Sequence, residues 1–363
     1  MTKLFSYRVG RLWVFVASGI ALLLTACGAA TPTQADVQPM VGPTTVVRLP
    51  VAPLPEFSTA ITDGYLAPPT APPLPTATIA PTADTTLLPP VAGAPEPDLA
   101  FSGDNAYAYL EAYMQFQPRY TGAPGWQQAG DYIVEQTTQA GWQVEEQHFP
   151  YQGVNVRNII AKRGSGPLLI IGAHYDARKY ADRDPDTAKQ REPVPGANDG
   201  GSGVAVLLEL AKHINTDQLG REVWLTFFDA EDNGEIEGWD WVAGSTYLAE
   251  HLPRKPEAMI LLDMIGDADL QIPYEQTSND TLKQSIWQTA AELGYQQFIP
   301  EQGYAITDDH TPFLERGIPA VDLIDFNYPA WHTVGDTADK VSPASLEAVG
   351  RTMEHWLETR ARP

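Results

Sequence analysis

The stretch REVWLTFFDAED, Arg221 to Asp232, begins as a run of apolar, β-prone residues and ends in three acids. Continuous apolar runs of this length are typical of strands that are buried on both faces, as in a parallel sheet. Two other runs show the same pattern, PLLIIGAHYDA at 167–177 and AMILLDMIGD at 258–267. We therefore predict that these three runs are core strands, and that polar residues gather where the strands end.

The segments around these runs complete the predicted fold. Gly and Pro at their ends delimit helices, which we expect at 104–116, 125–140, 202–215, 244–251 and 343–360. Further strands are expected at 141–149, 154–164 and 318–326. Apolar strands that alternate with helices predict an α/β fold, a three-layer sandwich with a largely parallel, twisted central sheet.

The N-terminus reads as a secretory leader. Lys3, Arg8 and Arg11 precede an apolar run that is too short for a comfortable membrane span. The run ends in Leu-Thr-Ala-Cys, which resembles a lipobox, so we predict a lipoprotein signal peptide over residues 1–27 with Cys27 as the lipid-modified residue. Cys27 is the only Cys of the chain, and a catalytic thiol is the alternative, but its place at the end of a leader argues against that role.

Composition divides the remaining chain in two. Residues 28–98 hold 16 of the 32 prolines and few charges, so we predict a disordered Pro/Thr/Ala-rich linker there. Residues 99–363 hold all seven His and every Trp except Trp13, and are predicted to form the folded domain. We expect a lipid-anchored protein at the cell envelope or the extracellular face of a bacterial membrane.

The charge of the chain limits its partners. Asp and Glu number 46 against 23 Lys and Arg, which gives a net charge of −23. Such an acidic chain is a poor ligand for nucleic acid or for an anionic membrane surface. We expect contact with the membrane only through the lipid anchor, and a monomeric protein.

A metal site is predicted at the strand ends. The carboxyl ends of parallel strands meet at one edge of a sheet, where ligands bind. Side chains predicted to meet there are His174, Asp199, Asp232, Asp263 and His332. Histidine with carboxylate suits Zn²⁺, and the charges permit either one zinc ion or two. Asp199 precedes an apolar helix and could alternatively serve as its N-cap.

Two further acids have predicted roles beside the metal. Asp176 lies two residues after His174 and is placed to orient that imidazole, with a solvated turn residue as the alternative. Glu231 precedes the ligand Asp232, and two adjacent carboxylates do not easily serve one ion in the same role. We therefore predict that Glu231 stays off the metal and carries protons.

Five motifs together resemble a known family. GAHYDA, GANDGGSGVA, FFDAED, LLDMIGD and WHT, in this order, resemble the zinc aminopeptidases of metallopeptidase family 28 and the animal-type glutaminyl-peptide cyclotransferases, which share their fold. The aminopeptidase resemblance implies that Asp199 bridges two zinc ions and that Glu231 is the general base. It also implies that Asp232 and His332 complete one zinc site, and His174 and Asp263 the other.

The C-terminal motifs lean toward the cyclotransferases. DDHTPFLERGIPAVDLI followed by YPAWHT is similar to their stretch that ends in Trp-His-Thr. This likeness implies one zinc ion and a carboxylate network around the substrate amine, formed by Glu231, Asp263 and Asp308. It also implies that Trp331 walls the glutamine pocket. Two positions depart from the pattern: Thr307 replaces a Gln, and a second pocket Trp lacks a counterpart at the same spacing, for which Trp239 or Trp241 is expected to substitute.

The sequence thus predicts that residues 99–363 form a zinc-dependent catalytic domain, and that this enzyme acts on the free N-termini of peptides or proteins. The first expectation is a glutaminyl-peptide cyclotransferase, which converts N-terminal Gln to pyroglutamate and releases ammonia. The alternative is an aminopeptidase of metallopeptidase family 28, which hydrolyses the N-terminal residue. The third, a non-catalytic surface-binding lipoprotein on the same fold, is disfavoured because the ligand set and Glu231 are all present.

Overall fold

The computed structural model describes residues 99–360. The predicted signal peptide, Cys27 and the linker over 28–98 lie outside the described residues. Between Leu99 and Arg360, no helix is both long enough and apolar enough to cross a membrane.

A six-stranded sheet forms the centre of the described domain, in the order β1-β2-β4-β3-β5-β8. Four strands run parallel: β3 (Leu168–His174), β4 (Glu222–Phe228), β5 (Ala258–Asp263) and β8 (Ala320–Ile324). The other two, β1 (Gln143–Tyr151) and β2 (Val154–Gly164), form an antiparallel hairpin beside β4. The largely parallel sheet that was predicted is confirmed, with the hairpin at one edge.

The register aligns the carboxyl ends of the parallel strands. His174, the last residue of β3, pairs with Phe228, the last residue of β4. On the other side of β3, Gly172 pairs with Leu261, which brings Asp263 at the end of β5 level with His174. The polar residues that follow these strands therefore meet at one edge of the sheet.

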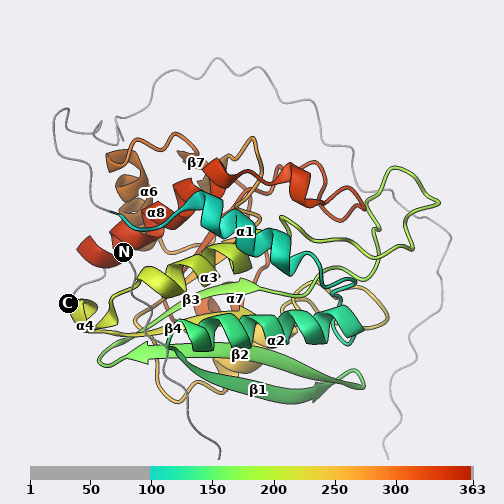
Figure 1. The fold of residues 1–363 in the computed structure, drawn as a ribbon, viewed down its shortest axis with the longest axis horizontal. Coiled ribbons are helices and arrows are strands. Elements are labelled where there is room, and N and C mark those ends of the chain that lie inside the picture. Colours follow the sequence, from blue (N-terminus) through green and yellow to red (C-terminus); the bar gives the residue numbers. More distant parts are fainter. Residues whose placement is uncertain (1–98, 361–363) are drawn as a thin grey trace, which may run out of the picture. The chain divides into compact units, whose positions relative to one another are not determined.

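Helices cover both faces of the sheet and complete the three layers. One face carries the larger core, with α1 (Gly103–Tyr113), α2 (Pro124–Gln139), α3 (Ser202–His213), α6 (Asp280–Glu292) and α8 (Pro343–Thr359). Figure 1 shows α1, α3 and α8 side by side on this face. The other face packs on α5 (Ala243–Glu250) and α7 (Thr311–Glu315). The short helices α4 (Thr216–Leu219) and η1 (Ala338–Lys340) lie in connections.

The chain reverses its direction of travel across the sheet at β3. The connection from β3 to β4 contains α3, and the connection from β4 to β5, which passes over β3, contains α5. Right-handed crossovers in opposite directions place their helices on opposite faces, as the two core clusters show for α3 and α5. Such a reversal opens a crevice at the strand ends, where ligands bind in open α/β sheets.

Elements beyond the prediction lie mainly between β5 and β8. A two-stranded parallel sheet of β6 (Ile272–Tyr274) and β7 (Phe298–Gln302) was not expected, because both strands are short and contain Pro. Helix α6 was also missed. Its signals were present, since Asn279 accepts a hydrogen bond from the Leu282 amide as an N-cap and Gly294 follows the helix.

Candidate metal centre

One half of the centre comes from the ends of β3 and β5. His174 and Asp263 are the last residues of these strands and are both buried. The His174 Nε2 atom lies 3.1 Å from Asp263 Oδ1 and 3.1 Å from Asp199 Oδ1. Two carboxylates from separate segments therefore converge on one imidazole nitrogen, which gives three potential ligands.

Asp199 reaches this point from the loop before α3. Gly200 has a φ of +77°, and a Cβ there would lie 2.3 Å from the carbonyl oxygen of Asp176, so the close approach of the loop requires glycine. The N-cap position of α3 is Gly201, with no side-chain cap hydrogen bond. The alternative of Asp199 as the N-cap is therefore wrong, and its carboxylate faces the two histidines instead.

The other half of the centre joins the loops after β4 and β8. His332 Nε2 lies 3.0 Å from Asp232 Oδ1 and 3.6 Å from Asp199 Oδ2. Asp199 thus presents one carboxylate oxygen to each histidine. Within residues 99–360, two clusters could hold a metal ion, and Asp199 is common to both: His174, Asp199 and Asp263, and Asp199, Asp232 and His332.

The donor set fits zinc. Donor atoms around a tetrahedral zinc ion with bonds of about 2.0 Å lie about 3.3 Å apart, and the atom pairs above span 3.0–3.6 Å. Both carboxylate oxygens of Asp232 and Oδ2 of Asp199 are buried and accept no hydrogen bond from the described residues. Buried carboxylate oxygens without donors need a cation, and nitrogen with oxygen donors suits zinc.

Backbone strain is concentrated around these ligands. Ala230, Met264 and His332 have left-handed φ angles of 57°, 45° and 55°. The first two follow the ends of β4 and β5 within two residues, and the third is itself a predicted ligand. Non-glycine residues in this region cost on the order of 1–3 kcal/mol and persist where surrounding contacts fix them, often at functional sites.

Asp176 lies behind His174 and also supports the β4 loop. Its Oδ1 atom is 3.6 Å from His174 Nδ1, on the side of the ring away from Asp199. Its carboxylate also accepts hydrogen bonds from the backbone amides of Glu231 and Asp232, both at 3.2 Å. Asp176 is fully buried, which argues against the solvated-turn alternative, and it links the ends of β3 and β4.

Burial and neighbouring charges shift the pKa of His174 and of the two acids beside the predicted ligands. Burial raises the pKa of Glu231 well above its ordinary value; His174 opposes this shift, whereas Asp232 and Asp308 add to it. Burial, together with Asp263, raises the pKa of Asp308 to about 7. Burial lowers the pKa of His174, but the carboxylates of Asp263, Asp176 and Asp199 outweigh it and raise this pKa well above its ordinary value. The site thus concentrates negative charge that a bound cation would stabilise.

A pocket of about 390 Å³ opens onto the candidate ligands. Its polar lining includes Glu231 and Asp308 as well as ligands of both clusters. Its apolar walls are Trp241, Ile306, Ile324, Phe326 and Trp331, with Tyr304 at 52% exposure. The pocket combines carboxylates with an apolar, aromatic wall, as expected of a site for a small group with a cationic end.

Of the three tryptophans that were candidates for the pocket wall, two line the pocket and one does not. Trp331 lines the pocket as predicted from the resemblance, and its ring stacks on His332 with centroids 3.9 Å apart. Trp239 does not line the pocket, because its ring packs against Tyr151 of β1. Trp241 takes the pocket position instead. Gly234 permits this, since a Cβ there would lie 2.0 Å from the Trp241 ring.

Several residues of the site escaped the sequence prediction. Asp336 accepts hydrogen bonds from the Asn198 and Asp199 amides, at 2.8 and 3.1 Å, and so fixes the Asp199 loop. Asp182 lies 3.6 Å from His332 Nδ1, and Arg178 contacts Asp182. None of the three ends a strand. For Arg178 and Asp182 the only signal was the density of charged residues after GAHYDA, which does not identify partners, and Asp336 lies apart from them, four residues after His332.

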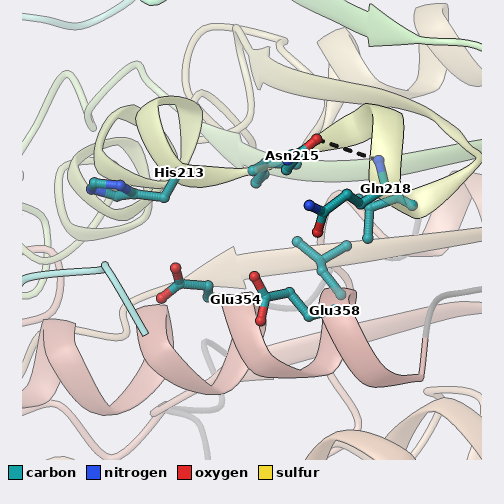
Figure 2. Close-up of a pocket in the computed structure, with 8 residues that line it drawn as sticks. His213, Asn215, Gln218, Glu354 and Glu358 are labelled. Atoms are coloured by element: carbon teal, nitrogen blue, oxygen red, sulfur yellow. Dashed lines mark hydrogen bonds between the residues drawn. The ribbon is translucent and has the colours of Figure 1, made fainter. Parts of the chain in front are cut away.

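A second pocket lies between the C-terminal end of α3 and α8. Figure 2 shows His213, Asn215 and Gln218 on one side of it, and Glu354 and Glu358 of α8 on the other. The pocket lies at the C-terminal end of α3, and the Asp199 loop precedes the N-terminal end, so the length of this 12-residue helix, about 18 Å, separates the two. It has a volume of about 10 Å³, room for about one water molecule, and holds none of the predicted site residues.

Comparison with known proteins agrees with this geometry. The model of peptidase family M28 matches residues 158–357. A Zn-dependent exopeptidase from Parabacteroides distasonis is 34% identical, with a TM-score of 0.68, over 73% of this chain and 100% of that one. Porphyromonas gingivalis glutaminyl cyclase is 34% identical, with a TM-score of 0.67, over 71% and 98%. A glutaminyl-peptide cyclotransferase of the snake Boiga irregularis is 26% identical over 290 residues, 66% of this chain and 76% of the relative.

The shared position of Asp199 gives a prediction for zinc content. Asp199→Ala should abolish zinc binding, because this carboxylate belongs to both clusters. Asp232→Ala and His332→Ala should each remove the zinc ion between them. Zinc per protein, measured by mass spectrometry on purified samples, checks this, with Glu235→Ala in the exposed part of the same loop as the control. Full zinc content in Asp199→Ala would refute the ligand assignment.

Proposed function

The chain belongs to peptidase family M28, and from that premise we propose that it is a glutaminyl cyclase. In this proposal it takes peptides or proteins with an N-terminal Gln, closes that residue to pyroglutamate and releases ammonia. The relatives and solved structures support a zinc-dependent enzyme of the M28 superfamily. The choice of the cyclase reaction is our inference from the pocket.

The position of Asp308 is the observation that favours cyclisation over hydrolysis. It lines the pocket with Glu231 and Asp263, is 3% exposed, and belongs to neither metal cluster. Hydrolysis needs one free carboxylate to take a proton from water. In cyclisation the substrate's own α-amine is the nucleophile. The amine must therefore be held beside the γ-amide, and it must lose a proton. A second free carboxylate beside the base suits that task.

The residues of the chain have defined parts in the proposed reaction. Bound zinc supplies a Lewis acid for the γ-amide carbonyl of the substrate. Asp263 and Asp308 accept hydrogen bonds from the α-amine. Glu231 takes a proton from this amine as its nitrogen bonds to the γ-carbonyl carbon, and gives the proton to the leaving nitrogen as the old amide bond breaks. Atoms balance, since one C–N bond replaces another and ammonia departs.

The apolar wall supports cyclisation for a second reason. Trp241 and Trp331 come from loops far apart in the sequence, and both rings stack on His332, with centroids 6.1 and 3.9 Å from that of the histidine. A glutamine side chain enclosed by such rings is shielded from water, which would otherwise hydrolyse the amide to glutamate. The shielding also holds the α-amine close to its target in a folded-back substrate.

Aminopeptidase activity is the second candidate, and one observation favours it. Both three-residue clusters are complete, so the chain offers ligands for two metal ions. In that case Glu231 would take a proton from water and give it to the amine of the leaving peptide. The non-catalytic alternative has little support, because the free carboxylate Glu231 stands beside a complete ligand set.

We further propose that the enzyme is secreted and held at the outer face of a bacterial membrane. The proposal is supported by the basic and apolar leader, the Leu-Thr-Ala-Cys sequence that ends at Cys27, and the Pro-rich residues 28–98. The linker would carry the catalytic domain away from the membrane, where peptide N-termini are accessible.

A paired assay tests the reaction. The purified protein is offered a Gln-initiated peptide and a Leu-initiated chromogenic amide, with zinc content measured on the same sample. We expect ammonia release and pyroglutamate from the first substrate and little cleavage of the second. Rapid hydrolysis of the Leu substrate without cyclisation of the Gln peptide would establish the aminopeptidase instead.

Glu231→Gln should separate catalysis from structure. We expect the variant to keep zinc and its melting temperature, while turnover falls by a factor on the order of 10²–10⁴, because an amide of the same shape cannot carry the proton. Glu235→Gln in the exposed part of the loop is the matched control and should retain full turnover. Near wild-type turnover with full zinc would mean that Glu231 is not the proton carrier.

Cys27→Ser tests the anchor. In a bacterial host the variant should leave the membrane fraction or remain unprocessed, because the serine hydroxyl cannot replace the thiol in lipid attachment. Fractionation of cells followed by mass spectrometry of the N-terminus provides the measurement. Unchanged processing and membrane retention would contradict the proposed anchor.

A further inference from the structure

The segment Arg178–Asp184 lies between β3 and the Asp199 loop and contains no predicted metal ligand, yet it contacts two of them. Arg178 is 3% exposed at its side chain, although it is charged. A buried guanidinium needs several partners to offset its desolvation. Its partners, and those of the residues that follow it, lie on the loops that carry Asp232 and His332.

Arg178 ties the segment to the loop after β4. Its Nη1 atom donates to the carbonyl oxygens of Asp232 and Gly234, at 3.1 and 3.3 Å. The same atom lies 3.5 Å from Asp232 Oδ1, and the guanidinium packs over the Trp241 ring at 4.8 Å. The Arg178 side chain thus contacts both the backbone carbonyl and the carboxylate of Asp232.

The next contacts tie the segment to the loop after β8. Asp182 Oδ1 lies 3.6 Å from His332 Nδ1, the ring nitrogen that faces away from the metal cluster. The Arg183 amide donates to the His332 carbonyl at 3.1 Å, and Asp184 Oδ2 accepts from the Val334 amide at 3.1 Å. Asp182 and Arg183 therefore contact His332 itself, whose φ of 55° is strained, and Asp184 holds the same loop two residues further on.

Arg178 and Asp182 also bind each other, which joins the two attachments. Arg178 Nε and Nη2 donate to the two oxygens of Asp182 at 2.9 and 2.6 Å. This forked pair uses the planar geometry that arginine has and lysine lacks. A continuous chain of contacts results, from Asp232 through Arg178 and Asp182 to His332.

We propose that Arg178 and Asp182 are positioning residues that set zinc affinity at the Asp199–Asp232–His332 cluster. Carboxylates that support the second nitrogen of a ligand histidine fix its orientation and raise its basicity. The other histidine, His174, has Asp176 in the corresponding place, so the proposal assigns each cluster its own support. This proposal rests on the zinc centre of the proposed function, and it holds whether the enzyme catalyses cyclisation or hydrolysis.

The test is zinc affinity, measured on the full-length protein by competition with a chelating dye. We expect Asp182→Asn and Arg178→Lys each to weaken zinc binding about 10–100-fold. Arg178→Lys retains the positive charge but cannot form the fork, so it separates geometry from charge. Asp186→Asn, four residues further along the same loop and exposed, is the matched control and should stay within about twofold of wild type.

The outcomes are decisive without any substrate. Wild-type zinc affinity in Asp182→Asn would overturn the proposal, and wild-type affinity in Arg178→Lys would show that charge alone suffices and overturn the role of the fork. If Arg178→Lys does not fold, Asp182→Asn decides, because the Asp182 side chain is 41% exposed and tolerates substitution. Failure of the glutamine assay leaves this measurement intact, so the two proposals fail separately.

Discussion

The carboxylate of Asp199 is the interaction on which the rest of the site depends. One of its oxygens faces His174 and the other faces His332, so a single side chain joins the two clusters. Asp232 and Asp263 are buried beside it, and although Arg178 Nη1 lies 3.5 Å from Asp232 Oδ1, Asp199 and Asp263 contact only histidines among the described ion pairs. Such a concentration of negative charge is stable only with protons or a cation. The fold around it serves to hold these acids at one point.

The α/β architecture explains how distant segments meet there. Parallel register aligns the ends of β3, β4 and β5, and the reversal at β3 opens the crevice between them. The loops then depart from ordinary backbone geometry, with left-handed residues at Ala230, Met264 and His332. Strain of this kind is stored where surrounding contacts over-determine the backbone. Asp176, Asp336 and the Arg178–Asp184 segment supply those contacts.

The sequence predicted the parts of this arrangement that follow from periodicity, and missed those that follow from three-dimensional folding. The apolar runs of β3, β4 and β5 carry a strong signal because they are buried on both faces, and His174, Asp232 and Asp263 follow from their ends. The roles of Arg178 and Asp182 could not be predicted from the sequence, because an exposed loop and a segment with a buried ion pair have the same charged composition. The choice between Trp239 and Trp241 stayed open for a related reason: the turn at Gly234 decides which ring faces the pocket.

Anomalous X-ray diffraction tests most directly whether the side chains that converge on Asp199 bind zinc. Data collected on crystals of the purified protein on either side of the zinc absorption edge locate the metal without reference to activity. We expect an anomalous peak between Asp199, Asp232 and His332, with or without a second peak beside His174 and Asp263. Zinc-replete crystals with no peak at Asp199 would contradict this expectation.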